Sequence, residues 1–298
     1  MIYSKPPLSI TDQISKLKQR GLKFHDEQRA AHYLSNISYY RLRAYTYPFQ
    51  DNTNPTHPFI TDISFEDIIE LYVFDRRLRL LVFNAIEKIE IALRTIIIYQ
   101  FSLKHGSHWH ENANMYRNLN YFKSNIDDLY KEVDRSTETF IEHYKNTYST
   151  PYYPPAWMSL EVISMGLLSK LFSNLIKCDE KKEVAKAFGL SHPMILESWM
   201  HAFAGLRNIC AHHSRLWNRR FTIVPKIPYN TINPFIRNRN INENKLYAQL
   251  CCINYLIQII SPKSSFVANL KKLLGTCTLV DCKEMGFPTD WRNEPIWV

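Results

Sequence analysis

The sequence has few glycines and no glycine-rich loop. Seven glycines in 298 residues argue against a loop-rich all-β fold and against a dinucleotide-binding design, because both need glycine in tight turns. Six scattered cysteines show no C-x2-C spacing, and no zinc signature, phosphate loop or set of paired acids at metal-binding spacing occurs. Hydrophobic residues nevertheless make up 45% of the chain. An all-α fold with a packed core is therefore the expectation, with no metal and no cofactor.

Signals for secretion or membrane insertion are also missing. Residues 1–12 contain no apolar segment of the signal-peptide type. The most apolar long run, residues 78–98, is interrupted by charges that would be costly at the centre of a bilayer, namely Glu87, Lys88, Glu90 and Arg94. We expect a soluble cytoplasmic protein that keeps its cysteines as thiols and has no membrane partner.

Acidic residues are absent from one long stretch. The chain carries a net charge of +9, and residues 198–242 contain no Asp or Glu at all. The same stretch holds Arg207, Arg215, Arg219, Arg220, Lys226, Arg237 and Arg239. Lys and Arg supply most non-specific affinity for nucleic acid by neutralising phosphates. The stretch therefore indicates RNA contact through Arg215, Arg219, Arg220 and Lys226, with a solvated basic surface as the alternative.

Helical spacing of apolar residues predicts most of the elements. We expect helices over residues 10–18, 26–44, 64–103, 157–175, 246–260 and 264–274, with a capping-box-like Ser64 and Asp67 opening the long third one and Gly106 ending it. Residues 276–298 read as an irregular tail that Trp291 and Trp297 pin to the core.

A further helix carries the residues around which the chain is organised. It is predicted to start near Ser191, as an N-cap, and to continue past Trp217. At about 100° per residue, its apolar side holds Phe203, Leu206, Cys210, His213 and Trp217. Asn208, His212, Arg215 and Arg219 line another side, with Arg207 beside them. His can move a proton near neutral pH, and Arg can grip a phosphate with two hydrogen bonds.

This stretch resembles a known family. Arg207-Asn208 with His212 matches the Arg-x4–6-His signature of HEPN-type ribonucleases, and RNICAHHSRLWNR resembles the hallmark of the Abi-like family of bacterial abortive-infection proteins, of the AbiD/AbiF type. Four further stretches are similar to the same family: Lys5-Pro6-Pro7-Leu8 through Arg20-Gly21-Leu22, residues 33–42, residues 154–161 and residues 285–297.

The resemblance implies a fold, an activity and partners. It implies a HEPN-like helical bundle over residues 51–275, with an N-terminal helical hairpin over 1–50 packed on it and the tail over 276–298. It also implies a metal-independent endoribonuclease that acts in phage defence or toxin-like growth arrest. Two motifs usually face each other across a dimer in that family, so we expect a homodimer, with RNA as substrate and a small RNA as regulator.

Roles follow for the motif residues. RNA carries its own nucleophile, the 2′-OH, so an enzyme needs to move protons and stabilise charge on phosphorus. We assign His212 as general acid or base, Arg207 as the clamp on phosphate and transition state, and Asn208 as the residue that orients by hydrogen bond. Two alternatives stay open: a non-cleaving dimer that holds a partner RNA, and an interaction module in which Arg207 and His212 make buried hydrogen bonds.

Three other groups of residues have two interpretations each. Residues 32–47 interleave tyrosines with arginines, so Tyr40, Arg41 and Arg43 are candidates for RNA stacking and contact, although such rings more often pack in the core. Glu87, Glu90 and Arg94 share a helix face and either help position Arg207 or His212 or form an ordinary ion-pair face. A histidine cluster, His105, His108 and His110, resembles a metal site only weakly. Small residues at Ala202, Ala204 and Gly205 are expected to admit a neighbouring helix at an interface.

Overall fold

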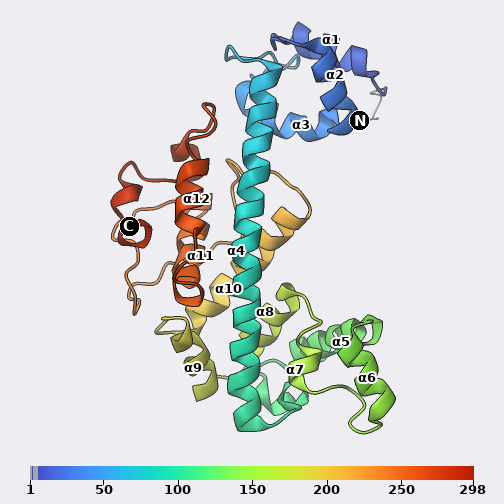
Figure 1. Cartoon of the computed structure of the whole chain (residues 1–298), viewed down its shortest axis with the longest axis vertical. Helices are drawn as coiled ribbons and strands as arrows, with labels where there is room; N and C mark the ends of the chain where they lie inside the picture. Colours follow the sequence, from blue (N-terminus) through green and yellow to red (C-terminus); the bar gives the residue numbers. More distant parts are fainter. Residues whose placement is uncertain (1, 3–5) are drawn as a thin grey trace. The chain divides into compact units, whose positions relative to one another are not determined.

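The predicted all-α fold is confirmed. The structure, a computed structural model, describes Ile2 and residues 6–298; Lys5, which opens one of the family-like stretches, lies outside them. Within this part, the chain forms twelve α-helices and six short 3-10 helices, and no strand (Figure 1). The α-helices are α1 (Ile10–Gln19), α2 (Glu27–Asn36), α3 (Tyr39–Thr46), α4 (Phe65–His105), α5 (Leu119–Arg135), α6 (Thr139–Thr147), α7 (Ala156–Ser159), α8 (Met165–Asn174), α9 (Asp179–Ala187), α10 (Pro193–Ala211), α11 (Leu246–Ile260) and α12 (Phe266–Leu273).

Two compact units divide the chain. The first comprises residues 1–79 and 270–281, and the second comprises residues 80–269 and 282–298. Helix α4 begins in the first unit and continues into the second. The boundaries of these units differ from those of the predicted domains, 1–50, 51–275 and 276–298. The predicted domains stay a prediction.

The first unit is built from short capped helices. Ser9 accepts the backbone N–H of Asp12 at the start of α1, and Gly21, with φ of 95°, turns the chain after it. The single helix predicted over residues 26–44 is wrong. Ile37 is extended and Ser38 caps a new helix by accepting the N–H of Arg41, so α2 and α3 are separate.

Helix α4 follows its sequence signals closely. Ser64 and Asp67 form the predicted capping box: the Ser64 N–H donates to Asp67 at 2.8 Å, and the Asp67 N–H donates to the Ser64 hydroxyl at 3.1 Å. Gly106, with φ of 83°, ends the helix where expected. Its part in the second unit buries one apolar residue per turn, including Ile86, Ile89, Leu93 and Ile97.

The predicted helix over residues 157–175 is also two helices. Helix α7 ends at Ser159, and Ser164 caps α8 by accepting the N–H of Leu167. The turn between them is held by Arg94 of α4, which donates to the backbone carbonyls of Glu161 and Ile163, each at 2.9 Å. A buried cation thus satisfies carbonyls that a continuous helix would have paired internally.

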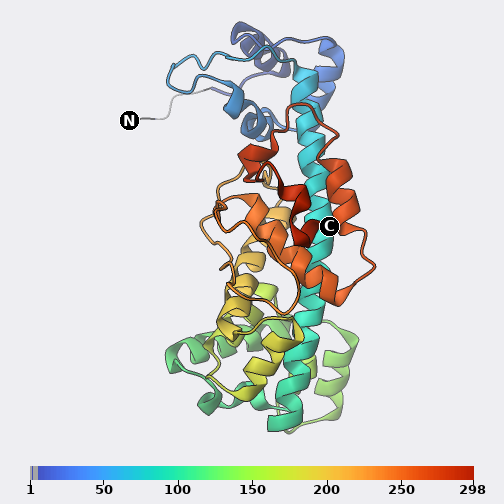
Figure 2. The ribbon, with the colours of Figure 1, turned by 90° about the vertical axis from the view of Figure 1, so that its left-hand side faces the viewer.

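Helix α10 is the centre of the second unit. It packs on α8, α9 and α11, and Figures 1 and 2 show α8 and α10 side by side. The predicted helix over 246–260 is confirmed as α11, and almost all of its residues are buried. After α12 the chain forms 3-10 segments, and Trp291 and Trp297 are buried as expected.

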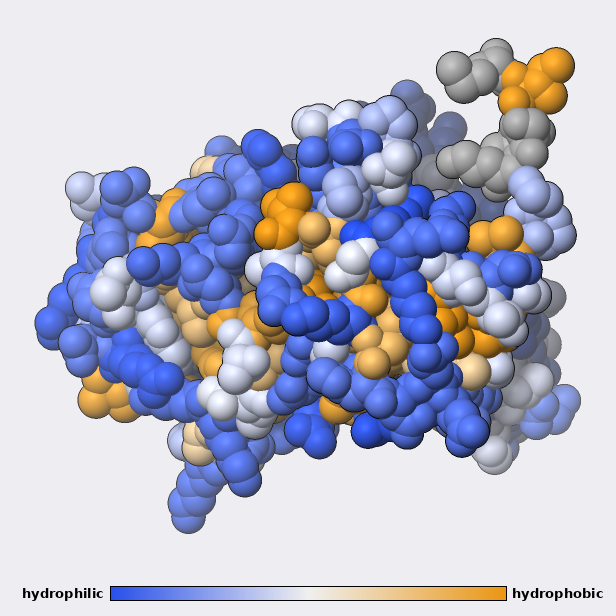
Figure 3. Space-filling view, turned by 90° about the horizontal axis from the view of Figure 1, so that it is seen from above, coloured by the Kyte–Doolittle hydropathy of each residue, from blue (hydrophilic) through white to orange (hydrophobic). Residues whose placement is uncertain are grey.

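One face of the molecule is mainly polar. Figure 3 shows one face that is largely hydrophilic, with hydrophobic side chains in smaller patches. None of the described helices combines the length and the apolarity that crossing a bilayer requires.

Candidate active site and nucleic-acid interface

Helix α10 is fixed by its buried side. Pro193 lies in its first turn, where a missing N–H costs little. The predicted cap at Ser191 is wrong, because His192 occupies the N-cap position and its side chain makes no capping bond. Phe203, Leu206 and Cys210 are buried as predicted. The motif therefore stands on a helix that the core holds in place.

The helix ends within the motif. The N–H of His213 donates to Cys210 O at 3.1 Å, and the N–H of Ser214 donates to Ile209 O at 3.0 Å. These two bonds, with His213 at φ of 56°, form a Schellman C-cap. His212 is the C-cap residue.

This ending corrects two predictions. His213 is exposed rather than part of the core, because the left-handed turn directs it away from the apolar side. Arg215 and Arg219 lie beyond the helix, so the polar stripe on α10 contains only Asn208 and His212. Trp217 is buried as expected, although from the loop and not from the helix.

Arg207 is held by an aromatic ring. Its guanidinium carbon lies 5.8 Å from the centre of the Phe83 ring on α4, a cation–π contact. The residue is half-buried, and no carboxylate of the described residues pairs with it. The ring thus fixes the cation while its hydrogen-bond donors stay available to an anion.

His212 and Asn208 are exposed and make no side-chain hydrogen bond within the described part of the chain. The only link between them is the His212 N–H, which donates to the backbone carbonyl of Asn208 at 2.9 Å. The alternative in which Arg207 and His212 make buried hydrogen bonds is therefore wrong. The role of Asn208 as a residue that orients by hydrogen bond stays a prediction.

Spacing on the helix separates the two charged groups. Five residues correspond to about 7.5 Å of rise and roughly 140° of rotation. Arg207 faces Phe83 while His212 projects from the end of the helix. One phosphate is difficult to reach from both side chains of a single copy.

The basic stretch after the helix is an ordered loop. Lys226 bridges to α10, since its N–H donates to the Ser198 hydroxyl at 2.8 Å and its carbonyl accepts the Trp199 ring N–H at 2.8 Å. Arg219 donates to the carbonyl of Arg215 at 3.1 Å. The loop therefore holds its cations on a fixed backbone.

Most of these cations lack an acidic partner. Among the described residues, no carboxylate forms an ion pair with the side chains of Arg207, Arg219, Arg220, Lys226, Arg237 or Arg239. Arg220 and Lys226 are exposed. Their charge is thus not compensated by neighbouring carboxylates, as a phosphate-binding surface requires.

The tyrosine-rich segment belongs to the first unit. Tyr40 is 84% exposed, Arg41 is exposed and Arg43 is half-buried, all on α3. Tyr45 instead is buried and donates to Asp75 at 2.6 Å. Some tyrosines of the segment therefore belong to the core, and others are exposed.

The acidic and basic residues of α4 contact other partners than the motif. Arg94 donates to Glu90 at 2.9 Å and reaches the turn at Glu161 and Ile163. Glu87 is exposed and has no ion-pair partner in the described part of the chain. None of the three residues bonds Arg207 or His212 among those contacts.

The three histidines of the cluster have different partners, although the rings of His108 and His110 stack with their centres 6.1 Å apart. His105 lies 3.5 Å from Glu180, and His108 contacts the carbonyl of Tyr153 at 3.1 Å. His110 is fully buried. Across the described residues, no three side chains of metal-ligating type converge.

The small residues of α10 are already covered by the chain itself. Ala202 and Ala204 are buried, and a Cβ added at Gly205 would lie 3.6 Å from Ile223. The close approach that Ala202 and Ala204 allow is used within one chain, and the expected interface with a second copy stays a prediction.

Fold and motif together define an all-helical protein with an Arg/His pair at the end of its central helix. A family model described as Abi-like protein matches residues 32–218, and the chain belongs to this family. No curated protein and no solved structure matches the chain.

Two features of the site were not predicted from the sequence. Phe83 lies 124 positions before Arg207, and nothing in the local pattern of α4 distinguishes this ring from its neighbours. A cavity between α5 and α8 was missed for the same reason, since its walls come from separate segments.

Proposed function

We propose that this Abi-like protein is a metal-independent endoribonuclease of the HEPN type. It acts in the cytoplasm, in phage defence by abortive infection or in toxin-like growth arrest. The observation that supports the proposal is the state of Arg207, a cation fixed on Phe83 without a carboxylate partner, close to an exposed His212 in a stretch free of acidic residues.

The chemistry uses the substrate's own nucleophile. The 2′-oxygen attacks the adjacent phosphorus, the bond from phosphorus to the 5′-oxygen breaks, and the products are a 2′,3′-cyclic phosphate and a 5′-OH. His212 removes the 2′-OH proton or donates one to the leaving oxygen. Arg207 stabilises the charge that builds up on the phosphoryl oxygens.

Two copies of the chain complete the site. Because Arg207 and His212 diverge around α10, one phosphate is gripped more easily by Arg207 of one copy and His212 of the other. Arg215, Arg219, Arg220 and Lys226 bind the flanking phosphates, and a small RNA on the same surface would restrain the activity. Light scattering at micromolar concentration is expected to show a dimer; a strict monomer with full activity would refute this arrangement.

The decisive experiment compares one histidine with another on the same helix. His212→Ala is expected to abolish cleavage of mixed RNA in EDTA while leaving the urea midpoint of unfolding unchanged, because the side chain makes no described hydrogen bond. His201→Ala, also exposed on α10, is the matched control and should cut like wild type. Arg207→Ala should lower turnover far more than RNA affinity, since its role lies in the transition state.

Substrate analogues test the nucleophile. DNA and 2′-O-methyl RNA should bind and resist cleavage, and RNA products should carry the cyclic phosphate. A His212→Ala protein that cuts at the wild-type rate in EDTA rejects the nuclease. Salt-dependent RNA binding without any cleavage by wild type would instead favour the non-cleaving dimer.

A further inference from the structure

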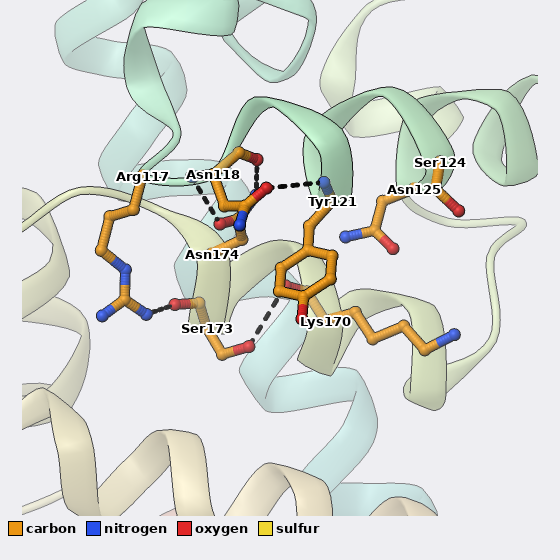
Figure 4. A pocket seen from close by; sticks show the side chains of 8 residues that line it. All are labelled: Arg117, Asn118, Tyr121, Ser124, Asn125, Lys170, Ser173 and Asn174. Atoms are coloured by element: carbon orange, nitrogen blue, oxygen red, sulfur yellow. Dashed lines mark hydrogen bonds between the residues drawn. The ribbon is translucent and has the colours of Figure 1, made fainter.

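A cavity of about 620 Å³, lined by residues with polar side chains, lies between α5 and α8 in the second unit. Its walls are eight residues, none of them acidic: Arg117, Asn118, Tyr121, Ser124, Asn125, Lys170, Ser173 and Asn174. Its volume falls within the range of small-ligand sites, roughly 300–1,000 Å³. Figure 4 shows the ring of Tyr121 reaching from α5 to the side chain of Lys170 on α8, with Ser124 and Asn125 further along α5.

The rim of the cavity is rigid. Asn174 accepts the backbone N–H of Asn118 at 3.1 Å and donates to the Asn118 carbonyl at 2.9 Å. Arg117 donates to the Ser173 carbonyl. The start of α5 is therefore bonded to the end of α8. These contacts keep the cavity open before a ligand binds.

One wall residue offers an amide to the cavity. Asn125 is only 6% exposed as a whole residue, but its amide atoms are accessible and make no hydrogen bond to any group that the structure describes. An asparagine amide carries a donor beside an acceptor. A ligand in the cavity with the complementary pair of groups would therefore form two hydrogen bonds with Asn125.

The other walls define the rest of that ligand. Tyr121 is 65% exposed and offers a ring face on which a planar base can stack. Lys170 is exposed and has no ion-pair partner in the described part of the chain, so it can bind a phosphate. Arg117 is less available, since Glu197 lies 3.8 Å away, although that carboxylate also pairs with Lys181 at 2.8 Å.

We propose that this cavity binds one nucleotide, with the base between Tyr121 and Asn125 and the phosphate on Lys170. Adenine is the favoured base, because an asparagine amide pairs with its N6 and N7. The nucleotide is either free or an unpaired residue of bound RNA. Only the alternative in which the nucleotide is part of an RNA rests on the proposed function. Glu197, beside the cavity, precedes Arg207 by about 15 Å along α10. One RNA strand could therefore occupy the cavity and the motif together.

Binding of mononucleotides tests the pocket without any need for cleavage. Calorimetric titration should show AMP binding about tenfold more tightly than ribose 5-phosphate, since the sugar phosphate lacks the stacked and hydrogen-bonded base. Asn125→Leu and Lys170→Ala should each lower the affinity for AMP about tenfold. The matched controls are Asn120→Leu and Lys123→Ala, exposed on α5 outside the cavity, which should bind like wild type.

Stability separates a binding role from a structural one. Asn125→Leu removes an amide that makes no hydrogen bond within the described part of the chain, so the variant should unfold near the wild-type urea concentration while binding AMP more weakly. Should that variant not fold, Lys170→Ala on the surface carries the test alone. Equal affinity for AMP and ribose 5-phosphate, or AMP affinity unchanged in Lys170→Ala, would overturn the proposal.

The source of the nucleotide is decided with 2′-O-methyl RNA, which the proposed reaction cannot cut. If Asn125→Leu lowers the affinity for this RNA as much as the affinity for AMP, the occupant is an RNA residue. If it lowers the affinity for AMP alone, the occupant is a free nucleotide. AMP binding in a protein that cleaves nothing would leave the pocket standing and reject the nuclease. If the protein cleaves RNA but does not bind AMP, and Asn125→Leu binds RNA like wild type, the nuclease stands and the pocket is rejected.

Discussion

His110 gives the second unit a sensitivity to acid. The residue is fully buried, and neither ring nitrogen has a hydrogen-bond partner among the described residues. Burial, with a smaller contribution from His108, lowers the pKa of His110 from 6.5 to about 3. We therefore expect His110→Leu to remove part of the pH dependence of unfolding.

The magnitude follows from linkage. Between pH 6.5 and 3 the unfolded chain takes up a proton that the folded chain refuses, so stability falls as the pH falls. Each unit of pH in this window is worth ~1.4 kcal/mol. The loss is ~2 kcal/mol at pH 5 and ~3 kcal/mol at pH 4, and it is close to zero above pH 7.5.

Urea unfolding followed by tryptophan fluorescence is the assay. All six tryptophans lie in the second unit, and Trp109 lies beside His110, so the signal reports the relevant part. From pH 7.5 to pH 5, His110→Leu should lose ~2 kcal/mol less than wild type. His143→Leu, on the exposed side of α6, is the matched control and should keep the wild-type slope. Equal slopes in wild type and His110→Leu would refute the reasoning.

Three further predictions concern the site and its support. Phe83→Leu keeps an apolar side chain but removes the ring under Arg207, so turnover should fall about threefold with little change in RNA affinity, and Phe83→Tyr should restore it. Arg219→Glu with Lys226→Glu should make the salt dependence of RNA binding shallower by roughly 1.4 in logarithmic slope, and an unchanged slope would place the RNA elsewhere. Arg94→Leu should cost about 3–5 kcal/mol of unfolding free energy in the tryptophan signal, because it leaves Glu90 and two carbonyls without their donor.

Local signals predicted the parts of the fold that local chemistry decides. The capping box at Ser64 and the stop at Gly106 depend on atoms a few residues apart, so the sequence contains the whole interaction. Apolar spacing placed α11 correctly because its residues are buried on nearly every side. The all-α class followed from composition and the same spacing.

Two helix ends were not predicted. In one, the partner that satisfies the free carbonyls lies far away in the sequence, and in the other, the residue at the cap is not one that usually marks a helix end. The carbonyls after α7 are satisfied by Arg94, about seventy positions earlier in the chain. The end of α10 lacks the glycine that usually marks a left-handed cap, because His213 occupies it. Periodicity continued smoothly through both places and therefore predicted uninterrupted helices.

The candidate site was also predicted only in part, because the sequence names its residues but not their contacts. The motif string identified Arg207, Asn208 and His212, but not the conformation that separates them or the ring of Phe83 beneath the guanidinium. Asn125 and Lys170, 45 positions apart, meet only because α5 and α8 pack together. Residue identity was readable from the sequence, whereas the partners of each residue required the fold.

Packing of α10 restricts how two copies could meet. Its small residues are covered by the chain's own elements, and Ile223 lies against Gly205. Its exposed residues include Asn208 and His212 at the C-terminal end, which is followed by a loop with several cations that lack acidic partners among the described residues. A dimer of this protein would therefore bring together two like-charged surfaces. Such a surface is stabilised by a polyanion between the copies, so the proposed pairing should become tighter when RNA is bound, and the motif would be completed only around its substrate.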